Sequence, residues 1–222
     1  MHKTIEQLDL VKKQVNEIVS KKQLKTNPKI IVVTKTFSLD KIIPLIENGH
    51  IHYGENKIQE AEDKWTDTKI KYKNLNLHMI GKLQTNKIKK ALNLFDYIHS
   101  LDNDKLAFKL FNYQKDISKN IKYFIQVNVG DEKHKSGIPL NELDKFYEYC
   151  IKELTLNVIG LMCLPPINLN SEKYFTLLKD SGLKLNLSEF SMGMSSDYKN
   201  AVSHGSTYLR IGTQIMGSRN IT

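Results

Sequence analysis

Short apolar runs alternate with helical segments along the whole sequence, and this alternation constrains the fold more than any other feature. The first run, Ile30-Ile31-Val32-Val33, is apolar on both faces and rich in β-branched residues. Such a run is typical of a strand buried in a parallel sheet. The pattern predicts eight strands, over residues 30–33, 51–53, 77–80, 97–99, 121–129, 158–164, 187–191 and 207–211.

Helical periodicity accounts for the segments between these strands. Apolar residues recur on one face of residues 3–24, which predicts an N-terminal helix. Seven more helices are predicted, over 38–48, 56–65, 84–94, 102–117, 139–153, 170–181 and 195–204. Eight strands alternating with helices are typical of a (β/α)8 TIM barrel. Since no linker or change of composition interrupts the pattern, we expect a single α/β domain over residues 1–222.

The charge balance bears on nucleic-acid binding. The 33 Lys and Arg residues exceed the 24 Asp and Glu residues, giving a formal net charge of +9. Clustered positive charge attracts nucleic acid, but the lysines are dispersed along the chain, and Arg210 and Arg219 are the only arginines. Because base-reading interfaces favour the bidentate fork of arginine, the sequence disfavours a nucleic-acid partner.

The sequence also predicts the compartment. No apolar run approaches the roughly 18 residues of a membrane span, and the N-terminal segment lacks the apolar core of a signal peptide. Two cysteines, Cys150 and Cys163, cannot build a disulfide scaffold. We therefore expect a cytoplasmic protein with reduced thiols and no membrane partner.

Several unusual residues follow the predicted strands, at the end of the barrel where the active sites of such proteins lie. Gly193 and Gly212 follow the seventh and eighth strands, whose loops commonly bind phosphate through backbone N–H groups and the start of a short helix. Ser191 and Thr213 would add hydroxyl donors. The sequence therefore predicts a site for a phosphate-bearing ligand.

Lys35 follows the first strand, so its amine is expected at the mouth of the barrel. Partial burial and nearby cations lower the pKa of a lysine and favour Schiff-base formation with a carbonyl compound. Lysine beside a phosphate site points to two carbonyl ligands, a sugar phosphate or pyridoxal phosphate. The chemistry of these residues leaves both open.

Eight segments in order resemble one known family. They are VTKTF at 33–37, YGENKIQE at 53–60, HMIGKLQTNK at 78–87, IQVNV at 125–129, KSGI at 135–138, GLMCLPP at 160–166, SMGMSSDYKNAVSHGST at 191–207 and LRIGTQIMGSR at 209–219. Through them the chain resembles the pyridoxal phosphate homeostasis protein family, whose fold is like the barrel domain of alanine racemase.

The resemblance implies pyridoxal 5'-phosphate (PLP) as the cofactor and assigns roles by matching position. Lys35 would hold PLP as a Schiff base, Arg210 would face the pyridine nitrogen, and Asn56 would line the pocket near the ring substituents. The phosphate cradle would consist of Ser191, Gly212 and Thr213. Ile80 and Met192 would be apolar walls. The resemblance implies neither catalytic residues nor a metal ligand.

The implied role is that of a carrier in PLP homeostasis. An arginine can only donate to the pyridine nitrogen, which leaves the ring a poorer electron sink than one paired with a carboxylate. Racemases of this type add a C-terminal β domain, and we expect none in a chain ending at Thr222. We therefore expect a monomer that transiently supplies apo PLP-dependent enzymes. The alternative is a small PLP-dependent racemase or another Schiff-base barrel enzyme.

Other candidate residues have simpler interpretations. Phe37 occupies a position where some relatives have a second lysine, and Lys135 matches a lysine that could form a secondary cofactor site. His52, His78 and His99 lie in or beside strands without a metal-ligand spacing. We expect them to line the barrel rather than to bind a metal.

Overall fold

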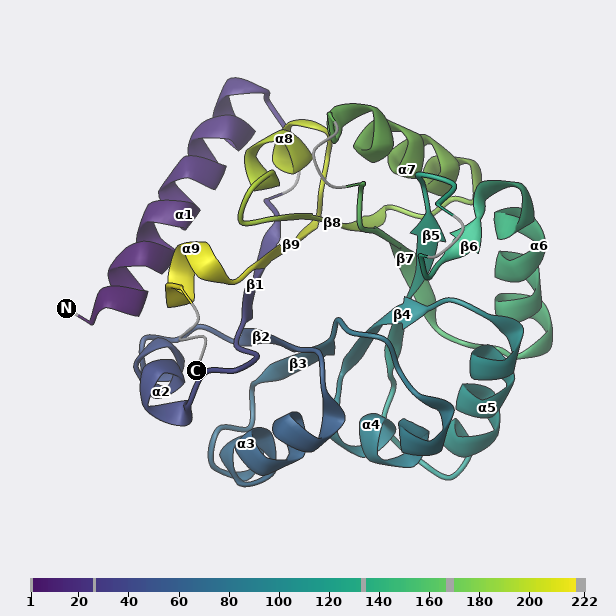
Figure 1. Cartoon of the computed structure of the whole chain (residues 1–222), viewed down its shortest axis with the longest axis horizontal. Helices are drawn as coiled ribbons and strands as arrows, with labels where there is room; N and C mark the ends of the chain where they lie inside the picture. The colour runs from purple at the N-terminus through teal and green to yellow at the C-terminus, as the bar shows by residue number, and fades with distance from the viewer. Residues whose placement is uncertain (1, 26, 133–134, 167–169, 219–222) are drawn as a thin grey trace.

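The computed structural model describes residues 2–25, 27–132, 135–166 and 170–218, and its strands form one parallel sheet within a ring of helices (Figure 1). Arg219 lies outside the described residues. The strands are β1 (Lys29–Val33), β2 (His52–Glu55), β3 (Asn76–Met79), β4 (Tyr97–Leu101), β5 (Lys122–Asn128), β6 (Ile138–Pro139), β7 (Val158–Cys163), β8 (Glu189–Met194) and β9 (Tyr208–Ile211).

The sheet closes on itself. Its order is β4-β3-β2-β1-β9-β8-β7-β5, and β4 also pairs with β5, so eight parallel strands form a barrel. The two-residue strand β6 pairs only with β5 among the described strands. Closure pairs every barrel strand on both sides and removes the free edges of an open sheet. The predicted (β/α)8 barrel is confirmed.

Helices surround the barrel and cover its outer face (Figure 1). They are α1 (Lys3–Lys21), α2 (Leu39–Glu47), α3 (Ile58–Lys71), α4 (Ile88–Leu94), α5 (Asp104–Gln114), α6 (Leu143–Glu148), α7 (Glu172–Lys184), α8 (Tyr198–Ser203) and α9 (Thr213–Met216). Within the described segments, none of these helices has the length and apolar character to cross a membrane.

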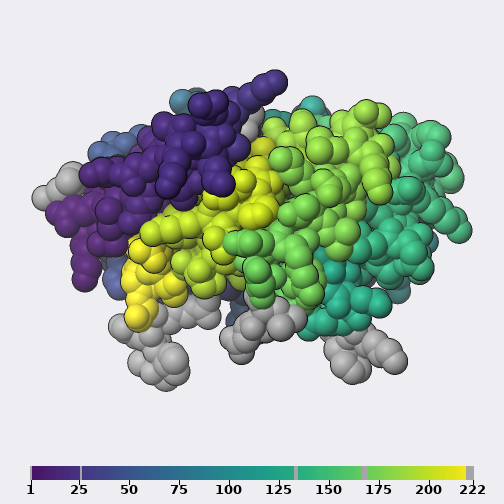
Figure 2. Space-filling model, turned by 90° about the horizontal axis from the view of Figure 1, so that it is seen from above, coloured from purple at the N-terminus to yellow at the C-terminus, as the bar shows by residue number. Residues whose placement is uncertain are grey.

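The predicted N-terminal helix is α1, and it packs beside the last described helices. Its buried face carries Leu8, Val11 and Val15, whose spacing places them on one side. The helix contacts α2, α8 and α9, and the hydroxyl of Tyr198 donates to the side-chain oxygen of Gln14. Figure 2 shows this helix, in purple, lying along the C-terminal segment, in yellow.

The apolar core has two parts. Most buried side chains fill the layer between the strands and the helices, as alternating inward and outward positions on each strand require. A second cluster is separate from this layer and consists of Ile31, Tyr97, Phe124, Met162 and Tyr208. Alternating positions on the same strands also carry polar residues, so the interior of the barrel is mixed in character.

Several predicted boundaries differ from the structure, including those of the helix predicted over 139–153 and of the strand predicted over 187–191. The predicted helix 139–153 is divided into β6, a 3₁₀ turn at Leu140–Glu142, the helix α6 and a π-helical turn at Tyr149–Glu153. The predicted strand 187–191 instead runs from Glu189 to Met194 as β8.

The extension of β8 depends on Gly193. Its φ is +93°, and a Cβ at this position would lie 2.5 Å from Cβ of Ala201, so only glycine fits both the backbone and the packing. Beyond it, Met194 still pairs with Arg210 of β9. Pairing with β9 therefore extends β8 beyond Ser191, where the sequence pattern predicts that the strand ends.

Candidate functional site

A cavity of about 550 Å³ opens at the carboxyl ends of the strands, within the size range of small-molecule sites. Its lining residues come from the ends of β1, β3, β7, β8 and β9, and they are Val33, Lys35, Ile80, Leu164, Met194, Ser195, Ser196, Arg210, Gly212, Thr213 and Gln214. Four predicted site residues, Lys35, Arg210, Gly212 and Thr213, therefore meet in one cavity.

Lys35 lies in a tight turn directly after β1. The N–H of Phe37 donates to the carbonyl oxygen of Thr34 at 3.1 Å, which closes the turn around the half-buried Lys35. The next residue, Thr36, has a φ of +69°. This left-handed conformation is costly for a β-branched residue, so surrounding contacts must hold the segment in place.

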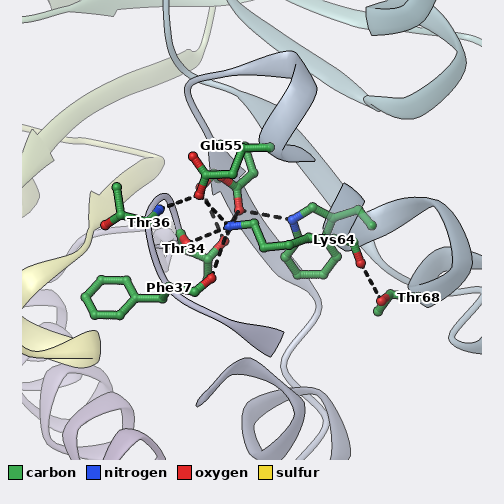
Figure 3. A network of polar contacts seen from close by, with 9 residues as sticks. Thr34, Thr36, Phe37, Glu55, Lys64 and Thr68 are labelled. Carbon is green, nitrogen blue, oxygen red and sulfur yellow. Dashed lines mark hydrogen bonds and ion pairs between the residues drawn. The ribbon is translucent and has the colours of Figure 1, made fainter. Parts of the chain in front are cut away.

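Those contacts come mainly from Lys64 on α3 (Figure 3). Its Nζ donates to the carbonyl oxygen of Thr34 at 2.9 Å and to that of Phe37 at 3.3 Å. On the other side of the turn, the N–H of Thr36 donates to the carboxylate of Glu60, which also pairs with Lys64 at 2.9 Å. The backbone on both sides of Lys35 is thus tied to α3.

A buried carboxylate completes this network. Glu55 at the end of β2 is 0% exposed, and its Oε1 lies 2.7 Å from Lys64 Nζ, 2.7 Å from Thr34 Oγ1 and 3.0 Å from Trp65 Nε1. Among the described residues, its Oε2 has no hydrogen-bond partner. The sequence does not indicate these roles, since only the four-residue spacing of Glu60 and Lys64 is typical of an ion pair on a helix.

Two backbone donors converge on Ser195, in the loops after β8 and β9 that line the same cavity as Lys35. The N–H groups of Gly212 and Gln214 point to Ser195 Oγ at 3.2 and 3.4 Å. Asp197 fixes the loop by accepting from the N–H of Met194 at 2.7 Å. A ring of N–H and hydroxyl donors suits an anionic oxygen.

The structure corrects the predicted position of Ser191. Because β8 continues to Met194, Ser191 lies inside the strand rather than in the loop, and its side chain is 0% exposed within the barrel. It does not line the cavity. Ser195, the first residue after the strand, occupies the predicted place beside Gly212.

Asn56 also lies away from the cavity wall. It is half-buried after β2, and its backbone packs against Gly81, where a Cβ would lie 2.4 Å from the Asn56 carbonyl oxygen. Of the two predicted apolar walls, Ile80 lines the cavity, while Met192 is buried in the layer between strands and helices.

Arg210 forms the polar floor of the cavity and is only 4% exposed. Its guanidinium donates to the backbone oxygens of Ser191 and Cys163 and to Ser191 Oγ. No carboxylate of the described residues forms an ion pair with it, and burial lowers its pKa from the ordinary value. The cavity floor is therefore a buried positive charge held by neutral groups.

The remaining candidates lie elsewhere. Lys135 pairs with Glu132 at 2.7 Å and does not line the cavity, and Phe37 is buried in the apolar layer. Cys150 and Cys163 are buried and unpaired, and burial raises the pKa of each thiol to about 12. In the described segments, His, Cys, Asp and Glu side chains form no group able to hold a metal ion.

The arrangement has a definite chemical character. Among the described residues that line the cavity, Lys35 and Arg210 are the only ones with ionisable side chains. A primary amine can form a covalent bond with a carbonyl compound, while the donors around Gly212 and the guanidinium suit an anionic, acceptor-bearing ligand.

Comparison with known proteins agrees with this geometry. Residues 7–220 match the family described as "Alanine racemase, N-terminal domain". A pyridoxal phosphate homeostasis protein of Aquifex aeolicus is 35% identical, over 86% of this chain and 87% of that protein. Its Escherichia coli K12 counterpart is 32% identical, over 86% of each.

Solved structures show the same relationship. PipY of Synechococcus elongatus PCC7942, solved with PLP bound, is 30% identical with a TM-score of 0.79, covering 91% of this chain and all of that one. Alanine racemase of Corynebacterium glutamicum shares the fold, with a TM-score of 0.69, 14% identity and coverage of 94% of this chain and 62% of that one. The chain thus belongs to the alanine racemase N-terminal domain family and, within it, to the pyridoxal phosphate homeostasis proteins.

Proposed function

We propose that this protein binds PLP in the cavity after the barrel strands, covalently on Lys35, and acts as a carrier in PLP homeostasis. The observation that carries the proposal is the presence of a lysine amine, a set of anion donors and a buried arginine in one cavity. The PLP bound by the similar PipY supports the choice of ligand over a sugar phosphate.

The residues of the cavity fit this cofactor. When bound, PLP supplies an aldehyde that reacts with amines and an electron-withdrawing ring. Lys35 would provide the amine. Ser195, Thr213 and the Gly212 N–H would bind the phosphate, because their hydroxyl and N–H groups are hydrogen-bond donors at the cavity. Arg210 would donate to the pyridine nitrogen. Asn56 and Ser191 do not line the cavity, so they would support the residues that do.

A carrier role is favoured by the lack of a second base in the cavity. Racemisation moves protons at two faces of a substrate and needs an acid or base at each. The described lining residues include no Asp, Glu, His, Tyr or Cys, and an arginine at the ring nitrogen weakens the electron sink. A racemase remains the competing hypothesis.

The same proposal includes how the protein would operate. We infer a single domain over residues 1–222 that works as a cytoplasmic monomer and passes PLP transiently to apo PLP-dependent enzymes. The exposed side chains of Leu164 and Met194 at the cavity support access from outside. The buried, unpaired cysteines are consistent with a reducing compartment. We propose neither a nucleic-acid nor a membrane partner.

The decisive experiment is spectroscopic. Protein loaded with PLP should absorb visible light, and borohydride reduction followed by peptide mapping should place the cofactor on Lys35. The Lys35→Ala variant should lose the band, while Lys152→Ala, which removes an exposed lysine that pairs with Glu148, should keep it. An unchanged band in Lys35→Ala contradicts the assignment. Steady amino-acid turnover abolished by Lys35→Ala would favour the enzyme hypothesis instead.

A further inference from the structure

Arg210 has more donors than its contacts within the protein use. Its Nη1 donates to the Ser191 carbonyl oxygen at 2.6 Å and to Ser191 Oγ at 2.7 Å, and Nη2 donates to the Cys163 carbonyl oxygen at 2.8 Å. A guanidinium has five N–H donors and no acceptor. Within the described residues, these three bonds leave two N–H groups for a ligand in the cavity, so the orientation of the guanidinium matters.

The hydrogen bond from Arg210 to Ser191 Oγ fixes the direction of the hydrogen bond between Ser191 and His99. Since arginine can only donate, Ser191 Oγ accepts, and the Ser191 hydroxyl proton needs an acceptor of its own. His99 Nδ1 lies 2.8 Å away, and both side chains are 0% exposed, which excludes bulk water. His99 therefore accepts at Nδ1 and carries its proton on Nε2.

The same reasoning continues through the barrel. His99 Nε2 lies 3.0 Å from His78 Nδ1, so His78 accepts there and carries its proton on Nε2. His78 Nε2 lies 3.0 Å from His52 Nδ1, so His52 in turn accepts at Nδ1 and carries its proton on Nε2. The chain ends at His52, the half-buried first residue of β2 at the amino-terminal end of the barrel. One proton arrangement thus satisfies every bond.

Neighbouring rings hold the imidazoles in this geometry. Tyr97 stacks on His78 with centroids 4.2 Å apart and planes at 16°, and Phe124 stacks on His99 at 4.3 Å and 19°. Burial lowers the pKa of His78 and His99 well below the ordinary value. Neutral rings are required, because a second ring proton would place two donors opposite each other.

We propose that His52, His78, His99 and Ser191 are positioning residues for Arg210, forming a one-way hydrogen-bond chain that aims its free donors at the cavity. The inference rests on the proposed function only for the identity of the ligand, the PLP ring nitrogen. Polarisation along such a chain strengthens each bond. The chain explains why Ser191 is a serine although it lies outside the cavity.

The proton arrangement can be tested on the protein without cofactor. Long-range ¹H–¹⁵N NMR of histidine-labelled protein at pH 8 should show Nε2–H tautomers for His52, His78 and His99. His204 is an internal control, because its Nδ1 lies 2.7 Å from the Asn200 carbonyl oxygen and must carry the proton. An Nδ1–H tautomer at His78 or His99 overturns the chain.

Variants test the effect on the ligand. Ser191→Ala and His99→Leu should bind PLP about tenfold more weakly, as expected for one hydrogen bond to a charged group, and should shift the absorption band of the bound cofactor. His99→Asn, whose side-chain oxygen can accept from Ser191, should recover part of both effects. His204→Gln should match the wild type.

The outcomes separate this inference from the proposed function. If the wild-type protein takes up no PLP but shows the three expected tautomers, the function fails and the chain stands. If PLP binds normally while Ser191→Ala and His99→Leu, both folded by circular dichroism, keep wild-type affinity and spectrum, the positioning role is overturned.

Discussion

Lys64 Nζ lies 2.7 Å from a carboxylate oxygen of Glu55, and the Glu55 side chain is 0% exposed. The same ammonium group binds the backbone oxygens of Thr34 and Phe37, on either side of Lys35. One buried ion pair therefore links the stability of the fold to the shape of the turn that carries the cofactor lysine.

Removing Lys64 should be strongly destabilising. Lys64→Met leaves the Glu55 carboxylate buried without its cation, and breaking such a pair lowers the free energy of unfolding by about 3–5 kcal/mol. The double variant Glu55→Gln, Lys64→Met should recover part of this loss. Urea denaturation measures both, with Lys152→Met as a control, since its exposed pair is worth less than about 1 kcal/mol. Equal losses in the single and double variants would contradict the explanation.

Ser195 and Ser191 should have separable effects on binding. Ser195→Ala removes a hydroxyl beside the Gly212 N–H, so we expect about tenfold weaker binding of PLP and unchanged binding of pyridoxal, which lacks the phosphate. Ser191→Ala should weaken both ligands equally, because it acts through Arg210. Absorbance titrations with the two ligands provide the comparison. A phosphate-selective loss in Ser191→Ala would restore the prediction made from the sequence.

Acid should destabilise this protein through histidines whose pKa burial lowers. Burial lowers the pKa of His50 and of His52 to about 4, with Lys29 and Lys122 adding to the effect at His52. The unfolded chain binds protons below about pH 6.5, so the free energy of unfolding should fall by about 1.4 kcal/mol per pH unit for each such histidine as pH drops from 6.5 towards 4. His52→Gln should reduce the slope measured by urea denaturation. A flat profile between pH 6.5 and 5 would contradict this expectation.

The two cysteines should be inert in the folded protein. Burial raises the pKa of Cys150 and Cys163 to about 12, and the thiolate is the reactive form. At pH 8, a thiol reagent such as Ellman's should titrate no thiol until denaturant is added, and two afterwards. Rapid modification of either cysteine before unfolding would show that the site is more accessible than its burial indicates.

The barrel could be predicted because its strands are encoded locally. Runs such as Ile30–Val33 are apolar on both faces, and the helices between them have a clear periodicity. Lys35, Gly212 and Thr213 could be placed together because strand ends meet at one face of a barrel, which needs only the order of elements along the chain. Arg210 was assigned from its match to the family.

The errors arose where distant parts of the chain decide the structure. Gly193 interrupts the strand pattern, so the sequence predicts that the strand ends at Ser191, but pairing of Met194 with Arg210 extends it. Ser191 therefore lies within the strand and not at the predicted phosphate site. Ser195 lies there instead, and the sequence pattern does not indicate it. The link from Lys64 to the Lys35 turn joins residues about 30 positions apart, and no local pattern specifies it.

The placement of α1 beside α9 has a consequence for how the chain folds during synthesis. The last described strand, β9, pairs with β1 across nearly the whole sequence, with Lys29 opposite Tyr208, and α1 packs against α8 and α9. Such contacts of high sequence separation form late and slowly. During synthesis the first helix can therefore pack against α2 early, but its contacts with α8 and α9 can form only after the C-terminal part of the chain has left the ribosome.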